Sequence, residues 1–238
     1  MDITSLSNLY RSQQLLQTSS TTQVDPVQKA FSSASARLAK DLQATSVQVS
    51  AYGQVKAGFA RAEDAGKALA TATSTTPAAD TKKGLQALVT AYNETRGAAA
   101  GTAPGNAQNA ANDLRRTLSS DANRSDLRAL GITQQKDGSL ALDTKALDSA
   151  LQANSANVRA VASRVGGQVE QTATRALATN GNLTSTLNTL NARAQGMEAR
   201  QAEQQGLASA SQQSVQQISA RLGNSLSSTD FYQRIFSL

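Results

Sequence analysis

The sequence contains no cysteine, no histidine and no tryptophan, and it has only four phenylalanine, four tyrosine and two methionine residues among 238. Without cysteine or histidine the chain cannot form a disulfide, a zinc finger, an iron–sulfur site, a Ser-His-Asp triad or an HExxH zinc site. Carboxylate, lysine and serine chemistry remains, and no catalytic constellation of those residues can be drawn along the chain. We therefore expect no enzyme activity, no cofactor, no metal and no small-molecule substrate.

Large apolar side chains are also scarce. Hydrophobic residues make up 39% of the chain and aromatic residues 3%. At roughly 25 cal/mol per Å² of apolar burial, such a chain must offset its ordering entropy through long, thin helix contacts or neighbouring subunits. No apolar run approaches the roughly 20 residues of a membrane-spanning helix, so we expect no membrane insertion. The first residues also lack the pattern of a secretory signal peptide.

The net charge is +6, from 23 basic and 17 acidic residues. A basic balance is typical of proteins that contact nucleic acid or another anionic surface. Here the basic residues are thinly spread, and the adjacent pairs are Lys82-Lys83 and Arg115-Arg116. A basic cytoplasmic coiled-coil protein that binds nucleic acid or an acidic partner is therefore one hypothesis for the function.

The apolar spacing predicts a mainly α fold, with long antiparallel helices that form a coiled-coil-like rod, one small β-hairpin and short helices. The first long helix is expected to begin with Asp25 as N-cap and Pro26 at its first position, and to end near Ala72. Its apolar seam falls at heptad multiples. The seam residues are Phe31, Leu38, Tyr52 and Phe59.

The last third of the chain predicts a second long helix, because apolar and small residues recur there at steps of three and four. Gln201, Gln204 and Ser211 interrupt this seam, and polar seam positions lower stability while they specify register and partner. The large apolar seam residues are Leu183, Leu187, Leu190, Met197, Val215, Ile218 and Leu222.

Shorter elements are expected between the long helices. A loop at Thr71–Asp80 precedes a helix from about Thr81, a flexible connector at Gly97–Gln108 follows, and a third helix covers Ala110–Leu118. We expect a hairpin at residues 130–143, with its tight turn at Lys136-Asp137-Gly138.

Three signals follow that hairpin. Asp143 is expected to cap a helix, and Asn154 or Ser155 to cap the next one. The Gly166-Gly167 pair predicts a hinge or helix break.

Both ends of the chain carry apolar side chains that fit neither seam. We therefore divide the chain into an N-terminal assembly segment (1–24), a helical leg (25–224) and a C-terminal assembly segment (225–238). Exposed apolar residues need a partner. The predicted self-assembly residues are Leu6, Leu9, Tyr10, Leu16, Leu226, Phe231, Tyr232, Ile235 and Phe236.

Four segments in this order resemble the flagellar filament capping protein (hook-associated protein 2) family. They are SVQVSAYGQVKAGFARAEDAGKAL, LQALVTAYNETR with its aromatic-asparagine pair, LRALGITQQKDGSLALDTKALDSALQANSANV and NGNLTSTLNTLNARAQGMEAR. Family members carry β-rich domains between their terminal regions, whereas only Thr71–Lys83 lies between the matching halves here. The chain thus resembles a short form without those central domains.

The resemblance implies a cap-like subunit at the tip of the bacterial flagellar filament that promotes flagellin polymerisation. It implies that the chain forms a ring-like homo-oligomer. It also implies flagellin and other axial proteins as partners, and an export chaperone as a further partner that binds the C-terminus. The expected location is the extracellular flagellum, reached by type III export without a cleaved signal peptide. A flagellin-like or junction protein of the flagellar axis is the alternative within this class.

Removal of Phe231–Leu238 tests the expectation that the chain ends order together on assembly. Neither end is long enough to form a stable helix alone in water, so circular dichroism should show nearly unchanged helix content. The oligomer mass should fall and motility should not be restored. A truncated protein that still forms full-size oligomers and complements a deletion strain would contradict this expectation.

Overall fold

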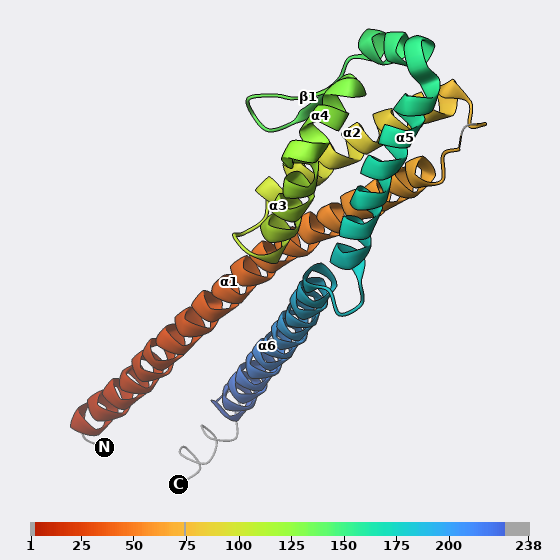
Figure 1. Ribbon diagram of the computed structural model, residues 1–238. Coiled ribbons are helices and arrows are strands. Elements are labelled where there is room, and N and C mark those ends of the chain that lie inside the picture. Colours follow the sequence, from red (N-terminus) through yellow and green to blue (C-terminus); the bar gives the residue numbers. More distant parts are fainter. Residues whose placement is uncertain (1–2, 74, 227–238) are drawn as a thin grey trace. The chain divides into compact units, whose positions relative to one another are not determined.

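The computed structural model describes the backbone of residues 3–73 and 75–226 and the side chains of 29–73 and 75–221 (Figure 1). The fold is mainly helical with one small antiparallel hairpin, as the sequence predicts. No helix in these residues combines the length and apolar character that crossing a membrane requires. The elements in chain order are α1 (Ile3–Ala70), α2 (Ala78–Ala100), α3 (Asn106–Ser119), α4 (Asp121–Ala129), β1 (Ile132–Gln134), β2 (Leu140–Leu142), α5 (Thr144–Leu177) and α6 (Asn182–Leu226).

The chain divides into two compact units, and α1 and α6 contribute to both. Unit 1 comprises residues 1–43 and 194–238, and unit 2 comprises residues 44–193. In unit 1 the Ser35 hydroxyl donates to the Gln204 side-chain oxygen at 3.3 Å. The half-buried positions of this unit recur at steps of three and four, as expected for two helices that share a narrow seam. They are Phe31, Ser35, Leu38, Leu42, Ala194, Met197, Gln201, Gln204 and Ala208.

Unit 2 holds the apolar core. Residues from all six helices and the hairpin reach it, so that even the two-stranded sheet has a packed face. Alanine and valine supply much of this core, which accounts for a packed interior in a chain with few aromatic residues. Its largest fully buried side chains are Phe59, Leu69, Leu85, Leu88, Leu114, Leu130, Ile132, Leu147 and Leu183.

The hairpin lies where the sequence places it. β1 and β2 pair antiparallel, with Ile132 opposite Leu142 and Gln134 opposite Leu140. The Gln135 N–H donates to the Ser139 carbonyl at 2.8 Å and closes a three-residue loop. Gly138 has φ +84°, a left-handed conformation that favours glycine. The predicted turn at Lys136-Asp137-Gly138 is confirmed.

Both predicted helix caps after the hairpin are also confirmed. One Asp143 carboxylate oxygen accepts from the N–H groups of Lys145 and Ala146 at 2.9 and 3.0 Å. Asn154 has non-helical φ −156° and ψ 81°, which makes a kink within α5. Its side-chain oxygen accepts from the Asn157 N–H at 3.0 Å, as an N-cap does.

The predicted helix start at Asp25-Pro26 is wrong, because α1 runs continuously from Ile3 to Ala70. No glycine or proline occurs between residues 3 and 25, so nothing upstream of Pro26 opposes helical backbone. The backbone of the predicted N-terminal segment is therefore part of α1 from Ile3 onward.

The predicted flexible connector at Gly97–Gln108 is mostly helical. α2 continues to Ala100 and α3 begins at Asn106, which leaves only residues 101–105 between them. Alanine has the highest helix propensity, and the burial of Ala99, Thr102 and Ala107 fixes this stretch against the core.

Helix α4 was not predicted, although its ends carry ordinary signals. The Ser120 hydroxyl accepts from the Asn123 N–H at 3.4 Å, Asp121 lies in the first turn and Arg128 in the last. Gly131 follows the helix with φ +71°.

The expected hinge at Gly166-Gly167 is wrong, because α5 is helical through both residues. A Cβ on Gly166 would lie 2.6 Å from the Leu69 Cβ and 2.7 Å from the Gly66 carbonyl oxygen. A Cβ on Gly66 would lie 2.7 Å from the Gly166 oxygen. The backbones of α1 and α5 are therefore in direct contact, and the two glycines permit this approach.

Gly166→Ala should lower the free energy of unfolding by about 1–3 kcal/mol, because backbone atoms of α1 would have to move away. The matched control is Gly167→Ala, whose Cβ would meet only the Ala70 Cβ at 3.9 Å. That control should raise stability by up to about 1 kcal/mol through helix propensity. Urea unfolding followed by circular dichroism measures both, and equal effects at the two positions would contradict the close-contact account.

Candidate functional site

The predicted self-assembly side chains lie outside the side chains that the structure describes, and so does the seam residue Leu222. They therefore remain predictions. The other predicted seam residues fall into three groups. Tyr52, Phe59 and Leu183 are buried, Val215 and Ile218 are exposed, and the rest are half-buried, namely Phe31, Leu38, Leu187, Leu190 and Met197.

Three large apolar side chains on α6 are exposed in unit 1. Leu207, Val215 and Ile218 have exposed fractions of 57%, 46% and 58%. At 100° per residue all three fall within one side of the helix, and we call them the apolar face of α6. Val215 and Ile218 continue the heptad spacing whose earlier members are half-buried. A helix face of this kind is typical of a contact surface for another chain.

In unit 2, three neighbouring side chains of α2 fasten the hairpin. The Asn93 Nδ2 donates to the Leu140 carbonyl at 2.8 Å, and the Leu140 N–H donates to the Asn93 Oδ1 at 2.8 Å. The Tyr92 hydroxyl donates to the Gly138 carbonyl at 3.0 Å. The Arg96 guanidinium donates to the Asp137 carbonyl and faces its carboxylate at 3.9 Å. These bonds hold both the turn and the outer edge of β2.

The surroundings of Tyr92 and Asp137 favour the protonation states that these hydrogen bonds require. Burial raises the pKa of Tyr92, and the positive charges of Arg96 and Arg115 oppose that rise. The pKa of Asp137 is lowered by hydrogen bonds from the Ser139 side chain and backbone, with a smaller contribution from Arg96. The phenol is therefore protonated and the carboxyl ionised at neutral pH.

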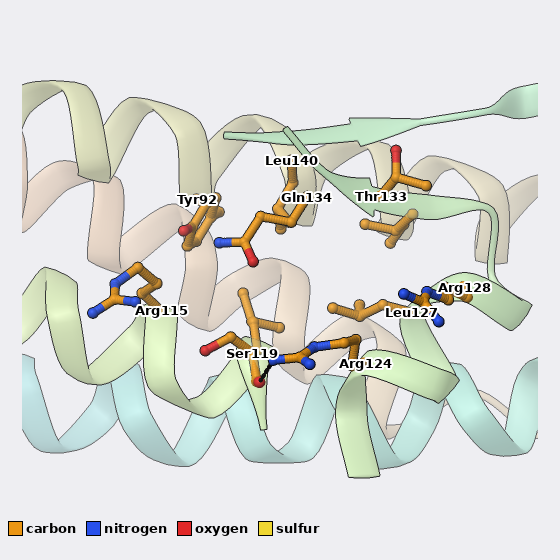
Figure 2. A pocket seen from close by; sticks show the side chains of 11 residues that line it. Tyr92, Arg115, Ser119, Arg124, Leu127, Arg128, Thr133, Gln134 and Leu140 are labelled. Atoms are coloured by element: carbon orange, nitrogen blue, oxygen red, sulfur yellow. Dashed lines mark hydrogen bonds between the residues drawn. The ribbon is translucent and has the colours of Figure 1, made fainter. Parts of the chain in front are cut away.

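A cleft of about 440 Å³ lies between the hairpin and helices α2, α3 and α4 (Figure 2). We call it the hairpin cleft. Its apolar lining residues are Leu118, Leu127, Ile132 and Leu140, and its polar ones are Tyr92, Arg115, Ser119, Arg124, Arg128, Thr133 and Gln134. Three of the eleven lining residues are arginines and none is acidic.

The arginines of the hairpin cleft differ in their partners. Arg124 donates to the Ser119 carbonyl at 3.2 Å and lies 3.6 Å from the Asp121 carboxylate. Arg115 and Arg128 are exposed and form no ion pair with any residue that the structure describes. Positive charge in the cleft is therefore only partly neutralised.

Sequence reasoning found parts of this arrangement and missed the cleft. It singled out the hairpin, the Tyr92-Asn93 pair and the Arg115-Arg116 pair. Arg124 and Arg128 were missed because α4 was not predicted, although their spacing of four residues was a usable signal. Across the described residues, no group of three acidic side chains is placed to hold a metal ion.

The fold and these contacts define a mainly helical protein with one small hairpin fastened to α2. The family model of the flagellar hook-associated protein 2 C-terminus matches residues 97–231, which is more than half of the chain. The chain therefore belongs to this flagellar cap family of structural proteins, and the resemblance to the family is confirmed. The match covers the third and fourth of the resembling segments, whereas the first two, at residues 46–69 and 85–96, lie before it. The matched region contains the hairpin, α3, α4, α5 and all of α6. Searches of curated proteins and of solved structures found no significant match.

Asn93→Ala should lower the free energy of unfolding by about 1–3 kcal/mol, because it leaves both backbone groups of Leu140 without their partner. The amide proton of Leu140 should also exchange faster with solvent. Gln86→Ala, at an exposed position of the same helix, is the control and should change neither quantity. Unchanged exchange at Leu140 in the Asn93 variant would contradict the role of Asn93 as the fastener of β2.

Proposed function

We propose that this chain is a cap-like subunit at the tip of the flagellar filament, where it forms a ring-like homo-oligomer and promotes flagellin polymerisation. The observation that carries the proposal is the family match over residues 97–231. Flagellin and other axial proteins are its proposed partners, with an export chaperone at the C-terminus before assembly. Its proposed location is the extracellular part of the flagellum, reached by type III export without a cleaved signal peptide.

The apolar face of α6 supports self-association as part of this function. Burial of a large apolar side chain contributes roughly 1.5–3 kcal/mol, so three such residues offer a useful contact once another subunit covers them. The polar seam positions nearby specify the register in which the helices pair, because Gln201 and Gln204 are half-buried rather than solvated. A ring needs both properties, since its contacts must be favourable and must repeat in one geometry.

A deletion strain tests the cellular role. Loss of a cap should leave short or absent filaments and unpolymerised flagellin in the medium, and the intact gene should restore both. Immunogold labelling should place the protein at the filament tip. Label along the whole filament would instead identify a flagellin-like subunit, and label near the hook a junction protein. Normal filaments without label would contradict every flagellar reading of the chain.

The contribution of the apolar face is tested with Val215→Ser combined with Ile218→Ser. The oligomer mass measured by light scattering should fall, because the variant removes most of the apolar area that a neighbouring subunit would cover. The matched control is Ala210→Ser with Ala220→Ser, two exposed positions of the same helix. An unchanged mass in the first variant would contradict the proposed contact without affecting the family assignment.

A further inference from the structure

The hairpin cleft has the charge of a site for carboxylates. Arg115 on α3 and Arg128 on α4 line it without an ion-pair partner among the described residues, and no acidic residue lines it. Other arginines of unit 2 show the contrasting case: Arg61, Arg116 and Arg164 each lie against a carboxylate. Guanidinium groups bind carboxylates in a bidentate geometry with charge-assisted hydrogen bonds.

The same cleft borders an unpaired strand edge. Gln135 donates to Ser139, and Asp143 donates to the Gly131 carbonyl at 2.8 Å, so odd-numbered residues of this hairpin bond across the ladder. Even-numbered residues therefore direct their N–H and C=O groups outward. On β2 the outward groups of Leu140 are bonded by Asn93. On β1 the outward groups of Gln134 have no partner within the described chain.

Two side chains of this strand point into the cleft that the arginines also line. Ile132 and Gln134 share one face of the hairpin with Leu140, and all three line the cleft. In Figure 2 the Gln134 side chain extends from the hairpin into the cleft on the side of Tyr92. A strand added beside β1 would direct every second side chain to that same face.

We propose that the hairpin cleft binds an acidic, extended segment of a partner polypeptide. The backbone of this segment pairs with the outer edge of β1 at Gln134, and its carboxylates bond Arg115 and Arg128. The apolar residues of the cleft cover the aliphatic parts of its side chains. This inference does not depend on the proposed cap function, since binding is measured on the isolated protein.

An acidic peptide fits these observations better than a nucleic acid. Nucleic-acid affinity comes from many phosphate contacts along an extended basic surface, whereas the cleft concentrates three arginines in about 440 Å³. A strand edge offers hydrogen bonds to a polypeptide backbone, and base stacking would need aromatic side chains, of which the cleft has only Tyr92.

Fluorescence anisotropy with the full chain tests the proposal. The probe is a dye-labelled peptide of alternating threonine and glutamate, and its control replaces every glutamate by glutamine. We expect saturable binding of the first peptide that weakens as salt rises, and binding at least about tenfold weaker for the second. Equal affinity for the two peptides, or no binding of either at low salt, would overturn the proposal.

Two protein variants separate the two parts of the site. Arg115→Glu with Arg128→Glu should weaken binding at least about tenfold. Arg175→Glu with Arg193→Glu changes the net charge equally at exposed positions outside the cleft and should leave affinity within about twofold. Gln134→Pro removes an outward N–H that makes no internal bond, so it should weaken binding while the thermal midpoint stays the same. If the proline variant unfolds, the arginine pair alone decides the test.

A nucleic acid or a second copy of this chain as the ligand of the cleft would give different results. If a labelled oligothymidylate binds more tightly than the acidic peptide and the Arg115/Arg128 variant abolishes it, the ligand is nucleic acid and the proposal is wrong. If that variant changes the oligomer mass in the absence of peptide, the occupant is a second copy of this chain and a separate acidic partner is excluded. Retained binding in the arginine variant would also overturn the proposal, with no consequence for the cap function.

Discussion

The bonds between Asn93 and Leu140 set the position of the hairpin in unit 2. A two-stranded hairpin is marginally stable by itself, and these strands have three residues each. The amide of Asn93 bonds both outward backbone groups of Leu140 on β2, as a third strand would. Because α2 occupies that edge, the apolar face of the hairpin is held on the core, and β1 is left as the open edge. The walls of the hairpin cleft follow from this one contact.

Glycine residues stabilise the core of unit 2 by allowing helix backbones to approach one another closely. A chain with 3% aromatic residues cannot separate its helices with bulky side chains and fill the space between them. Instead, Gly66 and Gly166 bring the backbones of α1 and α5 together, and Gly58 lies where a Cβ would overlap the Thr95 hydroxyl. Close packing of this kind gains dispersion contacts in place of large buried areas. It also makes the core sensitive to single methyl groups at a few glycines.

Local signals allowed much of the fold to be predicted from the sequence. Asp143 and Asn154 were recognised because an N-cap depends on bonds to residues two or three positions away. The turn at Gly138 was recognised for the same reason. The function of Gly166 was misread because a glycine in an apolar helix has the same local pattern at a hinge and at a close crossing. Only Gly66, one hundred residues away, distinguishes the two.

The cleft could not be predicted from the sequence, because its residues come together only when separate elements pack. Arg115, Arg128 and Gln134 belong to three elements, and no spacing rule joins them before the hairpin is fixed on α2. The two arginines also have the pattern of ordinary solvated side chains until the structure shows that no acidic residue lines the cleft. The self-assembly prediction differs, since it rests on apolar residues near the chain ends whose expected partners belong to other subunits.

The seam residues of the two long helices are buried to different degrees in the two units. In unit 2 the seam residues Tyr52, Phe59 and Leu183 are buried with other helices around them, so their burial needs no second chain. In unit 1 two helices alone cannot surround a core, and the seam there is at most half-buried along its described length. A seam of that kind contributes little stability to one chain. Its polar members and the exposed Leu207, Val215 and Ile218 are what a helix pair requires if further chains complete its packing.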